Sequence, residues 1–161
     1  MKQVKALIFD WGHTLMRDFP GYGGPMVKWP KVEAITGVAG LMTAVQNNHL
    51  CCVASNAGDS DAGLMSAALG RVDLKKYFHY FFTSKELGYK KPDPRFFTEI
   101  STRLGVLASD CLAIGNDYLK DIVPAKDCGM KTALYMEKLV SGQFPKADII
   151  LLSMAELLNY L

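Results

Sequence analysis

The chain has 161 residues, of which 50% are hydrophobic and 21% are charged, and its formal net charge is +2. This length and composition are typical of one globular domain with a buried core, so we expect a single domain over residues 1–161. The small charge argues against nucleic acid as a partner, and no run reaches the roughly 20 apolar residues that span a bilayer. The N-terminus, MKQVKALIFD, also lacks the apolar segment of a signal peptide. We therefore expect a cytoplasmic protein.

Six short apolar runs are typical of buried parallel strands, and most are separated by segments with helical periodicity. The predicted strands are, in chain order, Val4–Phe9, Leu50–Ala54, Tyr80–Thr83, Cys111–Ile114, Thr132–Tyr135 and Ile149–Leu152. The predicted helices are Val38–Val45, then Leu64–Leu69 opened by Asp59 and Ser60, Phe96–Leu104 begun by Pro94 and ended by Gly105, a helix around Ala125 and Cys128, and Met154–Tyr160. This alternation predicts a doubly wound α/β fold, with a mainly parallel sheet and helices on both faces.

The cysteines show no metal-binding spacing. Cys51, Cys52, Cys111 and Cys128 form no CxxC pair and no cluster with histidine, so we expect no zinc site. The first three lie within predicted strands, which predicts buried and reduced thiols.

Polar residues follow the predicted strands at the edge where such sheets bind ligands. They are Asp10 after the first strand, Ser55 and Asn56 after the second, Lys91 beyond the third, and Asn116, Asp117 and Asp121 after the fourth. A carboxylate nucleophile can accept a phosphoryl group, while a hydroxyl and an ammonium group can hold its oxygens. Carboxylates at the same edge can hold Mg²⁺, which prefers oxygen ligands.

Four motifs carry a resemblance to a known family. They are FDWGHTL, VASN, GYKKPDPRFF and AIGNDYLKDIVPAKDCGM, and in this order they resemble the motifs of the haloacid dehalogenase superfamily. Most members of that superfamily are Mg²⁺-dependent phosphohydrolases. The resemblance implies Asp10 as the nucleophile that forms an aspartyl-phosphate, Ser55 and Asn56 as phosphate-binding residues, and Lys91 as the lysine. It implies a Mg²⁺ site that includes Asp10, Asp121 and the position of Asn116.

The first motif departs from the family pattern at Gly12. The superfamily's phosphatases carry a second Asp there, which protonates the leaving group. Glycine can still offer its backbone carbonyl to Mg²⁺, but it cannot donate a proton. General acid catalysis contributes about 10²–10⁴-fold, so we expect slow hydrolysis. His13 is either a substitute proton donor that contacts the substrate or a loop histidine facing solvent.

The fourth motif departs from the pattern at Asn116, where the family has Asp. A neutral amide oxygen lowers the negative charge offered to a metal, and the neighbouring Asp117 is an alternative ligand. The sequence leaves the choice between them open. We expect Mg²⁺ binding to be retained but weakened.

The sequence has no insertion large enough to form the cap domain that many members of the superfamily carry, so we expect a core domain with an open site. The Gly/Pro-rich segment 16–32 remains between the first strand and the first helix. Its large side chains, Phe19, Tyr22, Met26 and Trp29, either line a substrate approach, contact a second subunit in a homo-oligomer, or pack on the core.

Three functional hypotheses follow. The first is a slow Mg²⁺-dependent phosphohydrolase acting on a phosphorylated small molecule or phosphoprotein. The second is cleavage of a carbon–halogen or carbon–phosphorus bond, because family members with these activities also lack the second Asp. The third is a catalytically degenerate domain that binds a ligand or partner without turnover.

Overall fold

The structure, a computed structural model, describes residues 3–161 and contains a six-stranded parallel sheet. The strand order is β3-β2-β1-β4-β5-β6, so the first strand of the chain lies inside the sheet between β2 and β4. The strands are β1 (Ala6–Phe9), β2 (Leu50–Ser55), β3 (Tyr80–Thr83), β4 (Cys111–Gly115), β5 (Lys131–Tyr135) and β6 (Ile149–Leu151). All five pairings between neighbouring strands are parallel.

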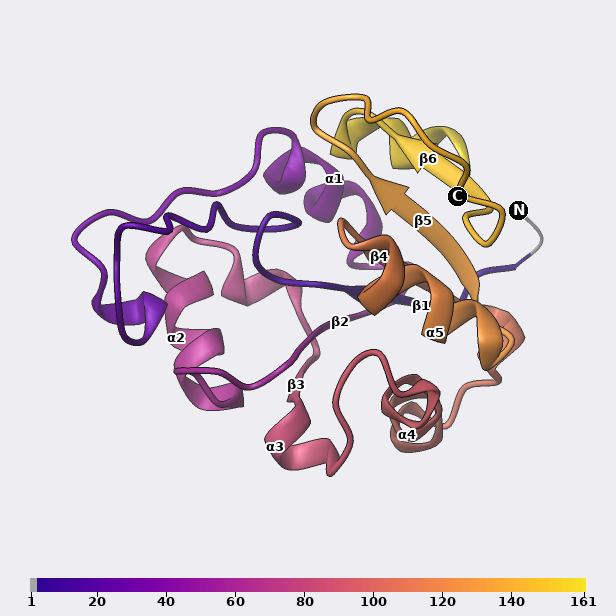
Figure 1. The fold of residues 1–161 in the computed structure, drawn as a ribbon, viewed down its shortest axis with the longest axis horizontal. Coiled ribbons are helices and arrows are strands. Elements are labelled where there is room, and N and C mark those ends of the chain that lie inside the picture. Colours follow the sequence, from indigo (N-terminus) through magenta and orange to yellow (C-terminus); the bar gives the residue numbers. More distant parts are fainter. Residues whose placement is uncertain (1–2) are drawn as a thin grey trace.

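Helices cover both faces of this sheet (Figure 1). The α-helices are α1 (Val38–Val45), α2 (Ala62–Arg71), α3 (Ser84–Leu87), α4 (Pro94–Leu104) and α5 (Val123–Asp127). Short helical segments of other types are η1 (Met26–Lys28), η2 (Lys75–Tyr77), η3 (Ala108–Asp110), η4 (Tyr118–Ile122) and η5 (Met154–Asn159). The predicted doubly wound α/β fold is therefore confirmed.

The alternation of side chains along β1 explains the two layers of helices. Leu7 and Phe9 belong to a core shared with α1, α2 and η5, whereas Ala6 and Ile8 belong to a second core shared with α3, α4 and α5. All four side chains are almost fully buried. Burying a side chain such as Phe9 stabilises the fold by roughly 1.5–3 kcal/mol. β1 is thereby fixed from both sides, and the residue that follows it is held in a defined place.

The predicted strands agree with the structure to within two residues, but three helix boundaries differ. The side chain of Asp61, rather than Asp59 or Ser60, caps α2 by accepting a hydrogen bond from Leu64 N. The helix expected around Ala125 and Cys128 is preceded by a π-helical turn, η4. The C-terminal helix is of the 3-10 type over Met154–Asn159. These details depend on individual hydrogen bonds, which apolar periodicity does not specify.

The segment between β1 and α1 folds onto the same core as the sheet. Met26 and Trp29 are buried, and Phe19 and Tyr22 pack against that core. The Trp29 indole Nε1 donates to Gly24 O at 2.9 Å, and Arg71 Nη1 of α2 donates to Trp29 O at 2.6 Å. These side chains therefore pack on the core, and Tyr22, Met26 and Trp29 also line a hollow that opens beside Gly12 and Ser55.

The four cysteines are free, and Cys51, Cys52 and Cys111 are buried as expected. Burial raises the pKa of the Cys51 thiol to about 12, which keeps it protonated. No helix between residues 3 and 161 is long and apolar enough to cross a membrane.

Candidate active site

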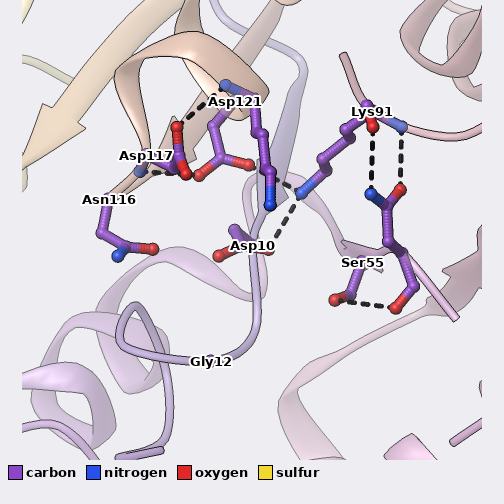
Figure 2. Close-up of a pocket in the computed structure, with 9 residues that line it drawn as sticks. Asp10, Gly12, Ser55, Lys91, Asn116, Asp117 and Asp121 are labelled. Carbon is purple, nitrogen blue, oxygen red and sulfur yellow. Dashed lines mark hydrogen bonds and ion pairs between the residues drawn. The ribbon is translucent and has the colours of Figure 1, made fainter. Parts of the chain in front are cut away.

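The sheet brings the polar residues of three strand ends together. Asp10 follows β1, Ser55 ends β2 and Asn116 follows β4, and these three strands are neighbours in the sheet. Together with Lys91 they line an open cavity of about 210 Å³, whose lining also includes Gly12, Asn56, Asp117, Lys120 and Asp121. Figure 2 shows these side chains converging from separate loops. Ligands bind at this edge in open α/β sheets.

Lys91 is the central charge of the cavity. Its Nζ lies 2.9 Å from Asp10 Oδ1 and 2.8 Å from Asp121 Oδ1 (Figure 2). It also donates to Ala54 O at 2.8 Å. The residue is only 5% exposed, whereas the neighbouring Lys90 is exposed. One buried ammonium group therefore joins the carboxylates that follow β1 and β4 and leaves neither buried charge unpaired.

The charges of this triad perturb one another. Burial alone would lower the pKa of Lys91, but the charges of Asp10 and Asp121 outweigh it and hold the pKa above its ordinary value. Burial, and after it the charge of Asp10, raises the pKa of Asp121 to about 6, although Lys91 acts in the opposite direction. Lys91 is thus a permanent cation, while Asp121 binds a proton more readily than a surface carboxylate does.

Asn56 holds the backbone of Lys91 in place. Its Oδ1 accepts from Lys91 N at 2.8 Å, and its Nδ2 donates to Lys91 O at 3.1 Å. The two bonds join the loop after β2 to the loop before α4, and they occupy the amide side chain. Asn56 lines the cavity, but its side chain positions Lys91.

Asn116 directs its amide toward the groups expected to hold a metal. One terminal atom of this amide lies 3.1 Å from Asp10 Oδ2, 3.2 Å from Gly12 O and 3.2 Å from Thr14 Oγ1. All hydrogen bonds are satisfied when that atom is Nδ2, which then donates to these oxygens. With Oδ1 in that place, a carboxylate, a carbonyl and an amide oxygen face one another, an arrangement that a hard cation stabilises.

Mg²⁺ is therefore compatible with the chemistry of this donor set. Between residues 3 and 161, no three His, Cys, Asp or Glu side chains cluster closely enough to hold a metal by themselves. The set instead combines Asp10 with Gly12 O and the amide of Asn116. These are oxygen donors of the kinds that Mg²⁺ takes from proteins.

Asp117 and Asp121 have other hydrogen-bonding partners. Asp117 Oδ1 accepts from Leu119 N and Lys120 N, both at 3.0 Å, and so caps η4. Asp121 Oδ2 accepts from Asp117 N at 3.0 Å. Of the two neighbours that the sequence left open, Asn116 is the one whose side chain faces Asp10 and Gly12.

Gly115 provides the space that the Asp121 carboxylate occupies. A Cβ atom at position 115 would lie closer than 3.0 Å to the side chain of Asp121. Position 115, the last residue of β4, is therefore restricted to glycine by the carboxylate of Asp121 rather than by its own backbone angles.

The structure does not bring His13 into the cavity. His13 is exposed, has a φ of 59°, and is absent from the cavity lining. Its ring instead lies near Glu137, whose pKa is lowered mainly by the hydrogen bonds with Arg17. Gly12 does line the cavity, with no side chain of its own.

Three residues near the cavity were not predicted from the sequence. Thr14 is fully buried and its Oγ1 lies 3.3 Å from Asp10 Oδ2. Lys120 lines the cavity beside Asp121. Asp18 Oδ2 lies 3.9 Å from the place where a Cβ on Gly12 would stand. Thr14 belongs to the first motif and Lys120 to the fourth, which is a usable signal, whereas nothing in the sequence indicates where Asp18 folds back.

Comparison with models of known protein families assigns the chain to a family. A family model described as "Haloacid dehalogenase-like hydrolase" matches residues 12–135, most of the chain. The chain belongs to the haloacid dehalogenase-like hydrolases. The resemblance that its four motifs carry is therefore confirmed.

Curated relatives include several named phosphatases. The chain is 37% identical over 78 residues to a glyceraldehyde 3-phosphate phosphatase of Methanopyrus kandleri, a match that covers 48% of this chain and 34% of that protein. It is 36% identical over 82 residues to a ribulose-1,5-bisphosphate 5-phosphatase of Halopiger xanaduensis, covering 51% and 34%. The matches thus span about a third of the length of these relatives.

Solved structures of haloacid dehalogenase-like hydrolases share the fold. A HAD phosphatase from Thermococcus onnurineus superposes with a TM-score of 0.82 at 14% identity, covering 98% of this chain and 97% of that one. A HAD hydrolase from Bacillus subtilis, solved bound to magnesium, superposes with a TM-score of 0.80 at 15% identity, covering 99% of each chain. At such low identity the likeness concerns the fold alone.

Proposed function

We propose that this haloacid dehalogenase-like hydrolase is a Mg²⁺-dependent phosphomonoesterase that acts through an aspartyl-phosphate on Asp10. One observation carries the proposal: the Lys91 ammonium, fixed by Asp121 and the backbone of Ala54, lies 2.9 Å from Asp10 Oδ1 in an open cavity beside Ser55. A carboxylate nucleophile and a cation for the phosphoryl oxygens are thereby present at one point.

The reaction has two steps. In the first, a carboxylate oxygen of Asp10 attacks phosphorus while the bond to the ester oxygen breaks, and the leaving group takes the electron pair of that bond. Lys91 and the Ser55 hydroxyl hold the phosphoryl oxygens. In the second step, water attacks the acyl-phosphate, which releases inorganic phosphate and restores Asp10.

Mg²⁺, when bound by Asp10, Gly12 O and Asn116 with Asp121 close by, would offset the negative charge of the phosphoryl oxygens. Asn116 contributes a neutral oxygen where a carboxylate would contribute a charge, so we expect weaker binding of the ion. Asp117 is the less suitable ligand because its Oδ1 caps η4.

The leaving group must depart with little help from a proton donor at position 12. Gly12 has no side chain, and His13 is exposed outside the cavity. We therefore propose that hydrolysis is slow for alkyl phosphates and faster for esters whose leaving group is a stable anion.

The substrate that we propose is a phosphorylated small molecule. The relatives named as glyceraldehyde 3-phosphate and ribulose-1,5-bisphosphate 5-phosphatases support this class over a phosphoprotein. We also propose that residues 1–161 form a single folded domain, that the protein is cytoplasmic, as its free cysteines support, and that it forms a homo-oligomer.

Two alternatives are retained because Gly12 favours them. Carbon–halogen or carbon–phosphorus cleavage does not need the missing acid, and a binding domain needs no turnover at all. A panel of p-nitrophenyl phosphate, acetyl phosphate, alkyl phosphates, a phosphonate and 2-haloacids, assayed with Mg²⁺ and with EDTA, separates the three functions. We expect Mg²⁺-dependent release of phosphate from the first two; halide release alone, or no reaction at all, would replace the proposal.

A further inference from the structure

A second hollow lies next to the cavity around Asp10, Ser55 and Lys91, which we call the phosphate cavity because we propose that it holds the phosphate. It has a volume of about 330 Å³ and shares Gly12, Ser55 and Asn56 with the first. Because the shared residues include the hydroxyl proposed to hold phosphate, the remaining part of a phosphate ester bound there has room to extend into this hollow.

Aromatic side chains of the segment 16–32, and Trp11, form one wall of the hollow. Trp11, Tyr22 and Trp29 line it, and the rings of Tyr22 and Trp29 are 5.6 Å apart. The indole Nε1 of Trp11 donates to Met16 Sδ at 3.2 Å, and that of Trp29 is bonded to a backbone carbonyl. Their polar atoms are thus occupied, and the rings offer apolar surface to a ligand.

The polar groups of the opposite rim have no such partners. Asp18 and Asp59 line the hollow, are exposed, and make no hydrogen bond or ion pair with another residue of the described chain. Ser60 also lines it and is only 5% exposed, yet its hydroxyl has no partner among residues 3–161. No fully buried side-chain polar atom of the described residues lacks a partner, so the Ser60 hydroxyl keeps access to the solvent of the hollow and is available to a ligand.

The charged residues that line the hollow are all negative. Its lining contains two carboxylates and no lysine, arginine or histidine. The nearest buried cation, Lys91, is already bonded to Asp10 and Asp121. An anionic group in the hollow would meet uncompensated negative charge, whereas a cationic group would be attracted.

We propose that this hollow is the leaving-group subsite, and that it selects phosphate monoesters whose leaving group combines an apolar or aromatic part with a positive charge. This inference rests on the proposed function, since it needs the phosphate in the first cavity. The aromatic wall takes the apolar part, Asp18 and Asp59 face the charge, and the Ser60 hydroxyl is free for a polar substituent.

Binding of two matched phosphonates tests the subsite without requiring turnover. 4-(Trimethylammonio)benzylphosphonate and 4-sulfobenzylphosphonate share a ring and a phosphonate but differ in the sign of the para charge. With Mg²⁺ present, we expect calorimetry to give the cationic ligand about tenfold tighter binding. The carboxylates attract the ammonium group and repel the sulfonate, and the two effects together reach about 1.4 kcal/mol, which corresponds to tenfold. In the Asp18→Asn/Asp59→Asn variant the ratio should fall to about twofold or less.

Asp73→Asn is the matched control, because it removes one exposed carboxylate that lies after α2 and is paired with Lys76, away from both cavities. The ratio should stay near tenfold in this variant. Equal binding of the two ligands, tighter binding of the sulfonate, or binding of neither would overturn the subsite. Turnover of the corresponding phenyl phosphates is measured separately: a cation preference in binding without hydrolysis would support the subsite and reject the phosphatase proposal.

Discussion

The two hollows at the strand ends differ in how their charges are balanced. In the phosphate cavity, the carboxylates of Asp10 and Asp121 are both bonded to Lys91, which is 5% exposed. In the neighbouring hollow, Asp18 and Asp59 are exposed and unpaired within the described chain. The charges of the first region are paired within the protein, whereas the carboxylates of the second region face solvent.

This difference follows from the elements that build each region. The phosphate cavity stands on the ends of β1, β2 and β4, which both cores hold rigidly. The second hollow stands mostly on loops, the segment after β1 and residues 58–60. Groups that perform chemistry need fixed distances, and groups that select a ligand can lie on loops of a stable scaffold.

Removing the nucleophile should have the largest effect. We expect Asp10→Asn to lower Mg²⁺-dependent phosphatase activity by about 10³-fold or more, because the covalent route has no other carboxylate at that strand end. The amide retains a hydrogen-bonding partner for Lys91, so circular dichroism should show a folded protein. Activity that persists in the purified variant would mean that Asp10 is not the nucleophile.

Displacing the Asp121 carboxylate by a larger residue at position 115 should have the next largest effect. Gly115→Ala places a Cβ within 3.0 Å of the Asp121 side chain, so the carboxylate must move away from Lys91. We expect a loss of about 10²-fold in activity and about 1–3 kcal/mol in the free energy of unfolding, measured by kinetics and urea denaturation.

Gly40→Ala in α1 is the control for this substitution. Nothing lies within 4 Å of a Cβ at that position, and alanine favours helix. Its activity should be unchanged and its stability equal or slightly higher. Equal behaviour of the two variants would show that Asp121 tolerates displacement.

Restoring a carboxylic acid at position 12, which lines both hollows, should have a smaller effect that depends on the leaving group. A Cβ at position 12 would meet only the side chain of Asp18, at 3.9 Å, so the Gly12→Asp substitution places its Cβ without a clash. We expect alkyl phosphate hydrolysis to rise by up to about 10²-fold and p-nitrophenyl phosphate hydrolysis to change little, measured as kcat/KM. Efficient alkyl phosphate hydrolysis by the unmodified protein would instead indicate that a donor such as Asp18 is already present.

The pH dependence of metal binding should show the smallest effect. Burial, and then Asp10, raises the pKa of Asp121 to about 6, so its carboxylate gains a proton as the pH falls through that value. The ionised form adds a negative charge close to the proposed Mg²⁺ position, so we expect the affinity to be constant above about pH 6 and to fall below it, by at most about tenfold per pH unit. Calorimetric titration from about pH 5 to about pH 8 measures this; a flat profile would mean that Asp121 does not influence the ion.

The sequence predicts the sheet well because buried parallel strands are nearly continuous apolar runs. The ends of β1, β2 and β4 follow from these runs, and so does the meeting of Asp10, Ser55 and Asn116. The two adjacent lysines, Lys90 and Lys91, are distinguished in the sequence only by the family motif, in which the lysine directly precedes Pro-Asp-Pro.

Other features of the site depend on contacts that no local pattern encodes. Asp117 caps η4 instead of facing the metal position, which is a matter of one backbone turn. Asp18 reaches Gly12 because the chain reverses over residues 11–16, where three backbone N–H groups donate to Trp11 O. Reversals of this kind are set by hydrogen bonds rather than by residue periodicity.

The amide of Asn116 can satisfy the oxygens of the proposed metal site without an ion. A carboxylate at this position would add a charge beside Asp10, and the repulsion would strain the strand ends until a cation arrived. The amide can instead turn its nitrogen toward Asp10 Oδ2 and Gly12 O and hold them by hydrogen bonds. We expect this side chain both to weaken Mg²⁺ binding and to hold the same oxygens when no ion is bound, so a chelator should abolish the proposed activity without lowering the free energy of unfolding.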